Sequence, residues 1–145
     1  QAPYDPALHM IFSQGTAFNK EPGVHIVLRH DGFGYGAGLY GLSPEGLDRY
    51  RQAVCNPDAR ARLLAALDRA KAVGCTPDVA DVKRLPKTYP SDPAWEHLLL
   101  RKSLIVRTQT DQPLPDWLFG PAAVQGLADL VAALAPLVHW LHQEV

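Results

Sequence analysis

The sequence has little cysteine, no long apolar run and almost no net charge, and each shortage excludes a class of protein. Its two cysteines, Cys55 and Cys75, stand outside any CxxC pattern, so neither a disulfide scaffold nor a cysteine zinc site is indicated. The most apolar stretch, from Ala122 to Val138, is broken by polar residues and a proline, whereas a membrane span needs roughly 20 uninterrupted apolar residues. A formal net charge of -1 provides no global attraction for nucleic acid or an anionic membrane. We therefore expect a cytoplasmic protein with no membrane partner and no general affinity for nucleic acid.

What the sequence does contain is enough apolar content for one globular domain. Of its 145 residues, 47% are hydrophobic and 20% are charged, which allows a single core spanning residues 1–145. Residues 83–107 carry six lysines and arginines against two acidic residues, whereas residues 108–145 carry none against four. The cations of this basic island are Lys83, Arg84, Lys87, Arg101, Lys102 and Arg107. The island is either a solvated face, partly neutralised by the acidic segment after it, or an anion-binding surface.

Apolar periodicity predicts strands and helices in separate blocks. Helical spacing after Ser43-Pro44 and Asn56-Pro57 predicts two consecutive helices, because Ser and Asn are preferred N-caps and proline suits the first helical turn. The last helix, with Val124, Leu127 and Val131 on its apolar stripe, is predicted from about residue 121 to 143. The predicted strands are 7–14, 23–30, 33–40, 81–85 and 103–110, and a short helix is predicted from 91 or 92 to 101. The absence of regular βαβ alternation predicts an α+β fold, with a mainly antiparallel sheet, a central hairpin and packed helices including a long C-terminal one.

Strand alternation sorts the hairpin of residues 23–40 into two unlike faces. The dipeptide Asp31-Gly32 suits a type I′ turn, which would place His25 opposite Gly38. One face then carries the core residues Val24, Ile26, Leu28, Tyr35, Ala37 and Leu39. The other face presents His25 and Arg29 opposite three glycines, Gly34, Gly36 and Gly38. Glycine weakens a strand interior, so three on one face indicate the close approach of another body, either a packed helix or a ligand, or else a bend in the strand.

His25 is the candidate for acid–base chemistry. Imidazole is suited to proton transfer near neutral pH, and Arg29 on the same face would hold an anionic substrate beside it. The alternative is a structural histidine, the commoner role of a single histidine on a strand. His139 and His142 stand three residues apart, but no HxxxH or HExxH pair occurs, so no metal site is predicted. The glycine run lies within a strand and not at a strand-to-helix turn, so no dinucleotide or other cofactor is predicted.

The segment Lys83–Pro90 is the most distinctive in the chain. Its prolines hold three cations and a phenol hydroxyl close together, an arrangement that loses little entropy on binding phosphate or carboxylate. The alternative is a docking loop whose Lys and Arg stems cover apolar surface. The predicted ligand contacts are Arg29, Lys83, Arg84, Lys87, Tyr89, Lys102, Gly34, Gly36 and Gly38.

Three functions stay open on these residues. The first is a domain that binds an anionic or phosphate-bearing small molecule, with or without catalysis. The second is a protein-interaction module without chemistry, whose glycine face receives a helix from a partner or from an N-terminal segment. The third is local nucleic-acid contact through the basic island, with Tyr89 and Trp95 as stacking surfaces.

Seven short motifs follow one another along residues 2–107. They are Ala2-Pro3-Tyr4, Pro22-Gly23-Val24-His25, the glycine-rich segment Gly34 to Leu39, Lys83-Arg84-x-Pro86-Lys87-x-Tyr89, Asp92-Pro93, Glu96-x-Leu98-Leu99 and Lys102-Ser103. In this order they resemble the domain of unknown function 2461 family. The resemblance implies an α+β fold and a cytoplasmic bacterial setting, and it implies no particular activity, substrate or cofactor.

The chain departs from that family in two loop positions and at its start. Thr88 stands where the family usually has glycine, and Ser91-Asp92-Pro93 replaces a commoner Asp-His-Pro. The family also has an N-terminal portion ahead of the Pro-Tyr motif. We therefore expect the chain to correspond to the C-terminal part of a larger family domain.

Overall fold

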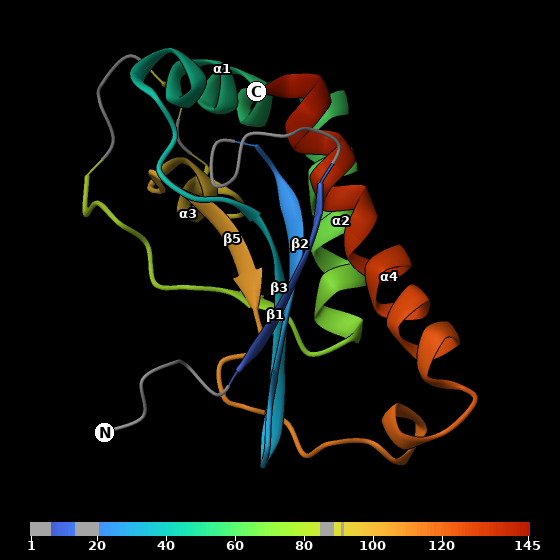
Figure 1. Cartoon of the computed structure of the whole chain (residues 1–145). Helices are drawn as coiled ribbons and strands as arrows, with labels where there is room; N and C mark the ends of the chain where they lie inside the picture. Colours follow the sequence, from blue (N-terminus) through green and yellow to red (C-terminus); the bar gives the residue numbers. More distant parts are fainter. Residues whose placement is uncertain (1–6, 14–20, 85–88, 91) are drawn as a thin grey trace.

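A five-stranded antiparallel sheet forms the centre of the molecule, with its two longest helices on one side (Figure 1). The computed structural model describes residues 7–13, 21–84, 89–90 and 92–145. The strands are β1 (Leu8–Ser13), β2 (Gly23–Arg29), β3 (Gly32–Leu39), β4 (Thr76–Pro77) and β5 (Leu104–Arg107), in the spatial order β1-β2-β3-β5-β4. The helices are α1 (Pro44–Cys55), α2 (Pro57–Ala72), α3 (Glu96–Leu99) and α4 (Ala123–Glu144), with a 3-10 helix, η1, at Asp116–Phe119. The predicted α+β class is confirmed.

The predicted starts of α1 and α2 are confirmed by their capping bonds. The Ser43 hydroxyl accepts a hydrogen bond from the Gly46 N–H, and the Asn56 side chain accepts from the N–H groups at the start of α2. Proline follows each cap at the first helical position, where its missing N–H costs nothing. Gly74, with φ of +83°, directly follows the C-cap of α2 in the left-handed conformation that glycine tolerates best.

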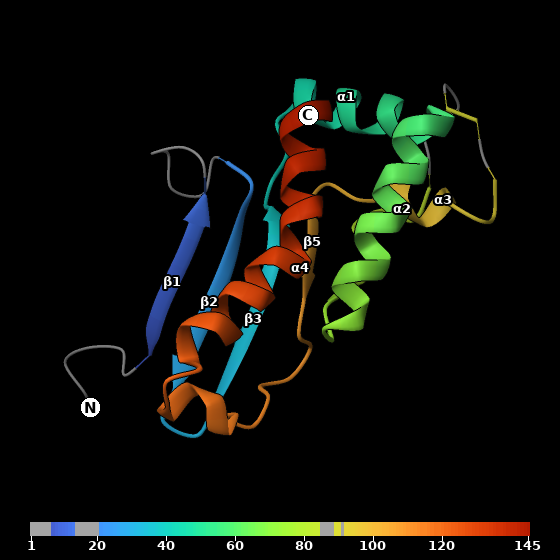
Figure 2. The same cartoon turned by 90° about the vertical axis from the view of Figure 1, so that its right-hand side faces the viewer.

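The core lies between the sheet and the layer formed by α2 and α4 (Figure 2). From the sheet it contains Ile26 and Val106, both fully buried, and α4 contributes a row of buried residues along its second half. Those residues are Leu134, Leu137, Val138, Trp140 and Leu141. Within the described part of the chain, α4 alone has the length and apolar composition of a membrane span. That is weak evidence of one, because core helices share both properties.

The hairpin register differs from the predicted one by two residues. His25 pairs with Gly36, and Gly32 already lies in β3, opposite Arg29. Phe33 consequently lies opposite Leu28 and is 5% exposed, whereas the predicted register placed it opposite His30 at the hairpin end. Burial of this ring decides the register. Because the shift is an even number, every side chain stays on its predicted face.

Two predicted elements differ markedly from the structure. Residues 81–84 form no strand; Asp81 instead accepts the N–H groups of Lys102 and Ser103, while Thr76–Pro77 pairs with β5. The rest of that predicted strand lies outside the described residues. The helix predicted from 91 or 92 to 101 contains only Glu96–Leu99.

The first turn of α4 does not join the core as predicted. Val124 is 80% exposed, because the ring of Trp117 from η1 packs onto the helix at Gly126 instead. Leu127 and Val131 do pack against the core, each partly buried.

Candidate functional site

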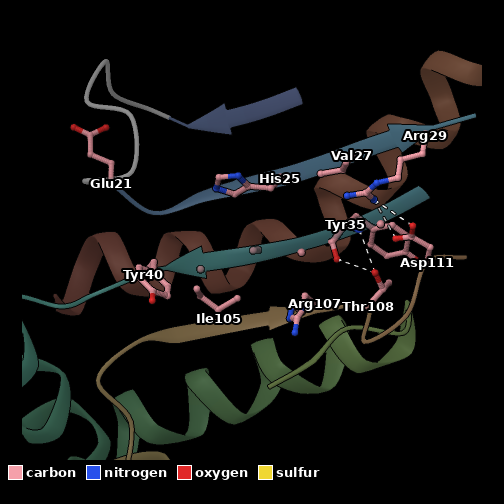
Figure 3. Close-up of a pocket in the computed structure, with 14 residues that line it drawn as sticks. Glu21, His25, Val27, Arg29, Tyr35, Tyr40, Ile105, Arg107, Thr108 and Asp111 are labelled. Atoms are coloured by element: carbon pink, nitrogen blue, oxygen red, sulfur yellow. Dashed lines mark hydrogen bonds and ion pairs between the residues drawn. The ribbon is translucent and has the colours of Figure 1, made fainter. Parts of the chain in front are cut away.

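The sheet face opposite α2 and α4, which we call the open face, bears a hollow of about 320 Å³ (Figure 3). Alternate residues of β2, β3 and β5 point to this face, because side chains change sides at each step along a strand. The glycines of β3 form its floor. The charged side chains and the histidine that line it are Glu21, His25, Arg29, Arg107 and Asp111.

His25 and Arg107 stand on the same rung of the sheet, although their strands are not neighbours. Both residues pair with Gly36 of β3, His25 from β2 and Arg107 from β5. Two strand spacings separate their Cα atoms by about 10 Å. Gly36 puts no side chain between them, although β5 approaches its backbone closely, and Figure 3 shows His25 and Arg107 on either side of β3.

The glycines of β3 are required by the chain's own packing. A Cβ atom at Gly36 would press into the Val106 carbonyl and the Arg107 side chain, and one at Gly38 would meet the Leu104 carbonyl. Gly38 also has a φ of +141°, which other residues rarely adopt. At Gly34 a Cβ would lie 3.3 Å from Asp111 Oδ1. The body that approaches this face closely is therefore β5 with the segment after it, not a helix.

One end of the hollow is closed by an ion pair that crosses β3. Arg29 Nη1 lies 3.2 Å from both carboxylate oxygens of Asp111. The segment that carries Asp111 is held in place because Phe33 and Gln112 exchange backbone hydrogen bonds of 2.9 and 2.7 Å. Both charged side chains are close to half exposed, 43% and 49%, so the pair contributes at most about 1 kcal/mol. Arg29, predicted as an anion contact, thus already has a carboxylate partner.

Arg107, a member of the basic island, lines the hollow although it was not among the predicted ligand contacts. Its Nε donates to Asp78 Oδ1 at 2.9 Å, and both side chains are about half exposed. Next to it, the Thr108 hydroxyl accepts a hydrogen bond from the Tyr35 N–H at 3.3 Å. The alternation of residues 104–107 placed Arg107 on a polar face, but only the pairing of β3 with β5 brings it to His25.

His25 is half-buried, and its environment favours the neutral imidazole. Burial lowers the pKa of His25 first, and the charge of His9 on β1 lowers it further. His9 lies diagonally across from His25, since the direct partner of His25 on β1 is Ile11. A neutral imidazole offers one donor and one acceptor nitrogen, so His25 enters the hollow as a potential proton acceptor.

The other predicted contacts lie elsewhere. The Tyr89 hydroxyl donates to Asp48 of α1 at 2.5 Å, which raises the pKa of Tyr89. Lys83, Arg84 and Lys102 are exposed, and the Val82 N–H donates to Leu100, which places residues 81–84 beside residues 100–103. None of these described residues lines the hollow. Lys87 lies outside the described residues.

The described part of the basic island does not form one surface. Arg101 is 7% exposed and donates to the Asp78 carbonyl at 2.6 Å, and Arg107 belongs to the hollow. The guanidinium of Arg60 lies 4.4 Å from the Trp95 ring centre, and that of Arg51 lies 5.8 Å from the Tyr89 ring centre. Arginines thus already contact both aromatic rings proposed for stacking, which weighs against the nucleic-acid hypothesis.

No group of three or more histidine, cysteine or acidic side chains suitable for a metal ion occurs within residues 7–13, 21–84, 89–90 and 92–145. Cys75 is buried and Cys55 is half-buried, and they are not bonded to each other. Burial raises the pKa of the Cys75 thiol to about 11, so it remains a thiol at neutral pH. The hollow's chemistry therefore rests on its histidine, its two arginines and their carboxylate partners.

Comparison with known proteins yields one match, to a family. The sequence model described as conserved hypothetical protein (DUF2461) matches residues 1–140. This match includes α4 up to Trp140, beyond the 2–107 covered by the motifs. Neither the curated proteins nor the solved structures contain a match.

Proposed function

We propose that this chain, which belongs to the DUF2461 family, binds a small ligand in the hollow. The anionic group of the ligand lies over Gly36, between His25 and Arg107. That group is a phosphate or a carboxylate. We also propose a cytoplasmic location, supported by two cysteines that form no disulfide with each other.

The observation that carries the proposal is the shared rung. A histidine and an arginine flank a residue without a side chain, so an anion in the hollow can receive hydrogen bonds from both sides. The guanidinium fork matches phosphate and carboxylate oxygens, and its bonds to them are charge-assisted. The hollow's volume of about 320 Å³ suits a small metabolite rather than a chain of residues.

The ion pair between Arg107 and Asp78 does not prevent an anion from binding to Arg107. Arg107 engages Asp78 through its Nε, and the pair is about half exposed to solvent. Pairs of this kind contribute little free energy, so replacing Asp78 with a ligand anion costs little. His25 would then hydrogen-bond the same anion, and its position lets it exchange a proton with the ligand.

Sulfate is a suitable probe, because it mimics a phosphate group and keeps its charge across the neutral range. Titration followed by amide NMR should shift the Gly34, Gly36 and Gly38 resonances together. Arg107→Gln should weaken sulfate binding about tenfold, which corresponds to the loss of charge-assisted hydrogen bonds worth about 1.4 kcal/mol. His25→Gln should weaken it as well.

Arg62→Gln is the matched control. Arg62 is a half-exposed arginine of α2 that pairs with Glu144 at 2.7 Å, away from the hollow. The variant removes the same charge and should leave sulfate binding near its parent value. Sulfate that shifts no glycine of β3, or that binds equally well to the Arg62→Gln and Arg107→Gln variants, would contradict the proposal.

A second candidate, the protein-interaction module, is favoured by exposed apolar residues on β1. Leu8 is 58% exposed and Phe12 is 42% exposed, at one edge of the sheet. A partner held there would shift β1 resonances rather than those of β3, and its binding would not change with Arg107→Gln. The same NMR experiment therefore separates the two functions.

A further inference from the structure

We infer that the ligand is a zwitterion, carrying a cationic group near Asp111 as well as the anion over Gly36. This inference rests on the proposed function and names its ligand class. The structure assigns the selection of the cationic group to Asp111 and Thr108, two residues that follow β5.

The first support is the charge of the hollow. Its lining holds two arginines, Arg29 and Arg107, against two carboxylates, Glu21 and Asp111. Asp78, bonded to Arg107, adds a third carboxylate at the rim. A ligand with only negative charge meets the two carboxylates of the lining as well as its two arginines. A ligand with one positive and one negative charge can pair with both the carboxylates and the arginines of the lining.

The second support is the position of the acceptor oxygens over Gly34. The point where a Cβ of Gly34 would stand is 3.3 Å from Asp111 Oδ1 and 3.4 Å from Thr108 Oγ1. Two acceptors thus converge on a residue that has no side chain. Arg29 approaches both Asp111 oxygens with a single nitrogen, so the carboxylate retains lone pairs for a second donor. The Thr108 hydroxyl accepts one bond from the Tyr35 N–H and likewise retains acceptor capacity.

The spacing of the two subsites defines the ligand. Gly34 and Gly36 are two residues apart on one strand, which separates the acceptor pair from the His25–Arg107 rung by about 6–7 Å. An α-amino acid, whose amine and carboxylate are attached to the same carbon atom, is too short to reach both. An ω-amino acid or an aminoalkyl phosphate with a few methylenes between its charges spans the distance.

Four small probes test this inference by NMR or calorimetry. They are δ-aminovalerate, valerate, norvaline and sulfate. Valerate lacks the amine, and norvaline is an isomer of δ-aminovalerate whose amine is on the carbon next to the carboxylate. We expect δ-aminovalerate to bind about tenfold tighter than valerate or norvaline, the usual worth of one added charge-assisted contact. In Asp111→Asn, δ-aminovalerate should bind no tighter than valerate does in the same variant, whereas sulfate should bind at least as tightly as in the parent, because a carboxylate paired with Arg29 is removed. Asp116→Asn, at an exposed residue of η1 outside the hollow, is the matched control and should keep the preference.

The outcomes separate this inference from the proposed function. If sulfate and valerate shift the resonances of the β3 glycines but δ-aminovalerate binds no tighter than valerate, the ligand is not a zwitterion, and the proposed anion site is still supported. If norvaline binds best, the spacing argument is wrong. If none of the four probes shifts these glycines, the proposed function fails and the inference fails with it.

Discussion

His25 and Arg107 lie on either side of Gly36 on one face of the sheet, each paired with it from a different strand. The glycine between them contributes no side chain to the hollow that both residues line. The arrangement needs three strands, and the middle one must carry a residue without a side chain. This relationship defines the candidate site.

Gly36→Ala should destabilise the fold. The added methyl group would press into the Val106 carbonyl and the Arg107 side chain, so β3 and β5 must separate. Overpacking of this kind costs about 1–3 kcal/mol, measured as the change in the free energy of unfolding in urea. Gly120→Ala is the control, because nothing lies within 4 Å of its Cβ position. Equal stability of the two variants would show that β5 approaches β3 less closely than described.

Gly126→Ala should release η1 from α4. The new methyl group would occupy the place of the Trp117 ring, which packs directly on Gly126. We expect a loss of about 1–3 kcal/mol in stability and an indole resonance of Trp117 that moves toward its solvent-exposed position. Ala128→Gly, an exposed site two residues further along α4, should leave that resonance unchanged. A parent-like Trp117 signal in Gly126→Ala would contradict the packing.

Stability should fall as the pH is lowered below about 6.5, the ordinary pKa of histidine. The pKa values of His25 and His97 are both lowered in the folded chain, chiefly by burial. The unfolded chain then binds more protons than the native chain in this range, so protonation favours unfolding. His25→Gln should make the dependence of unfolding free energy on pH shallower than in the parent.

His97 provides a comparison for that measurement, because burial lowers its pKa as well. His97→Gln should likewise make the dependence of unfolding free energy on pH shallower. An unchanged slope in His25→Gln, with a clear slope in the parent, would assign the effect to other groups.

Asp78→Asn should strengthen sulfate binding. The substitution removes the carboxylate that competes with the anion for Arg107. An exposed pair is worth up to about 1 kcal/mol, so we expect up to about fivefold tighter binding by calorimetry. Asp68→Asn, at an exposed residue of α2, makes the same change in net charge. If both variants gain equally, the gain comes from net charge and not from release of Arg107.

Much of the local structure was predictable, because it depends on neighbouring residues. Ser43-Pro44 and Asn56-Pro57 predicted the starts of α1 and α2 through capping, and alternation predicted the two faces of the hairpin. The two-residue error in register left every side chain on its predicted face, since the side-chain period of a strand is two. The turn itself was wrong, because burial of Phe33 outweighed the preference of Asp31-Gly32 for a type I′ turn.

The candidate site was predictable only in part. His25 and the β3 glycines were identified from one hairpin, whose partners lie close in sequence. Residues predicted from a local cluster of cations, such as Tyr89 and Lys102, do not line the hollow, because closeness in sequence does not place side chains on one surface. Arg107 was missed as a site residue for the opposite reason, since its partner strand lies far back in the chain.

The sequence by itself determined most of the helices and strands, which hairpin face is polar, and that this face is nearly bare of side chains. Those properties follow from capping, periodicity and the missing Cβ of glycine, all of which act over a few residues. Only the tertiary structure decided that β5 lies beside β3 and brings Arg107 to Gly36. That choice depends on burying Leu104 and Val106 in the common core, a free energy that no local pattern contains.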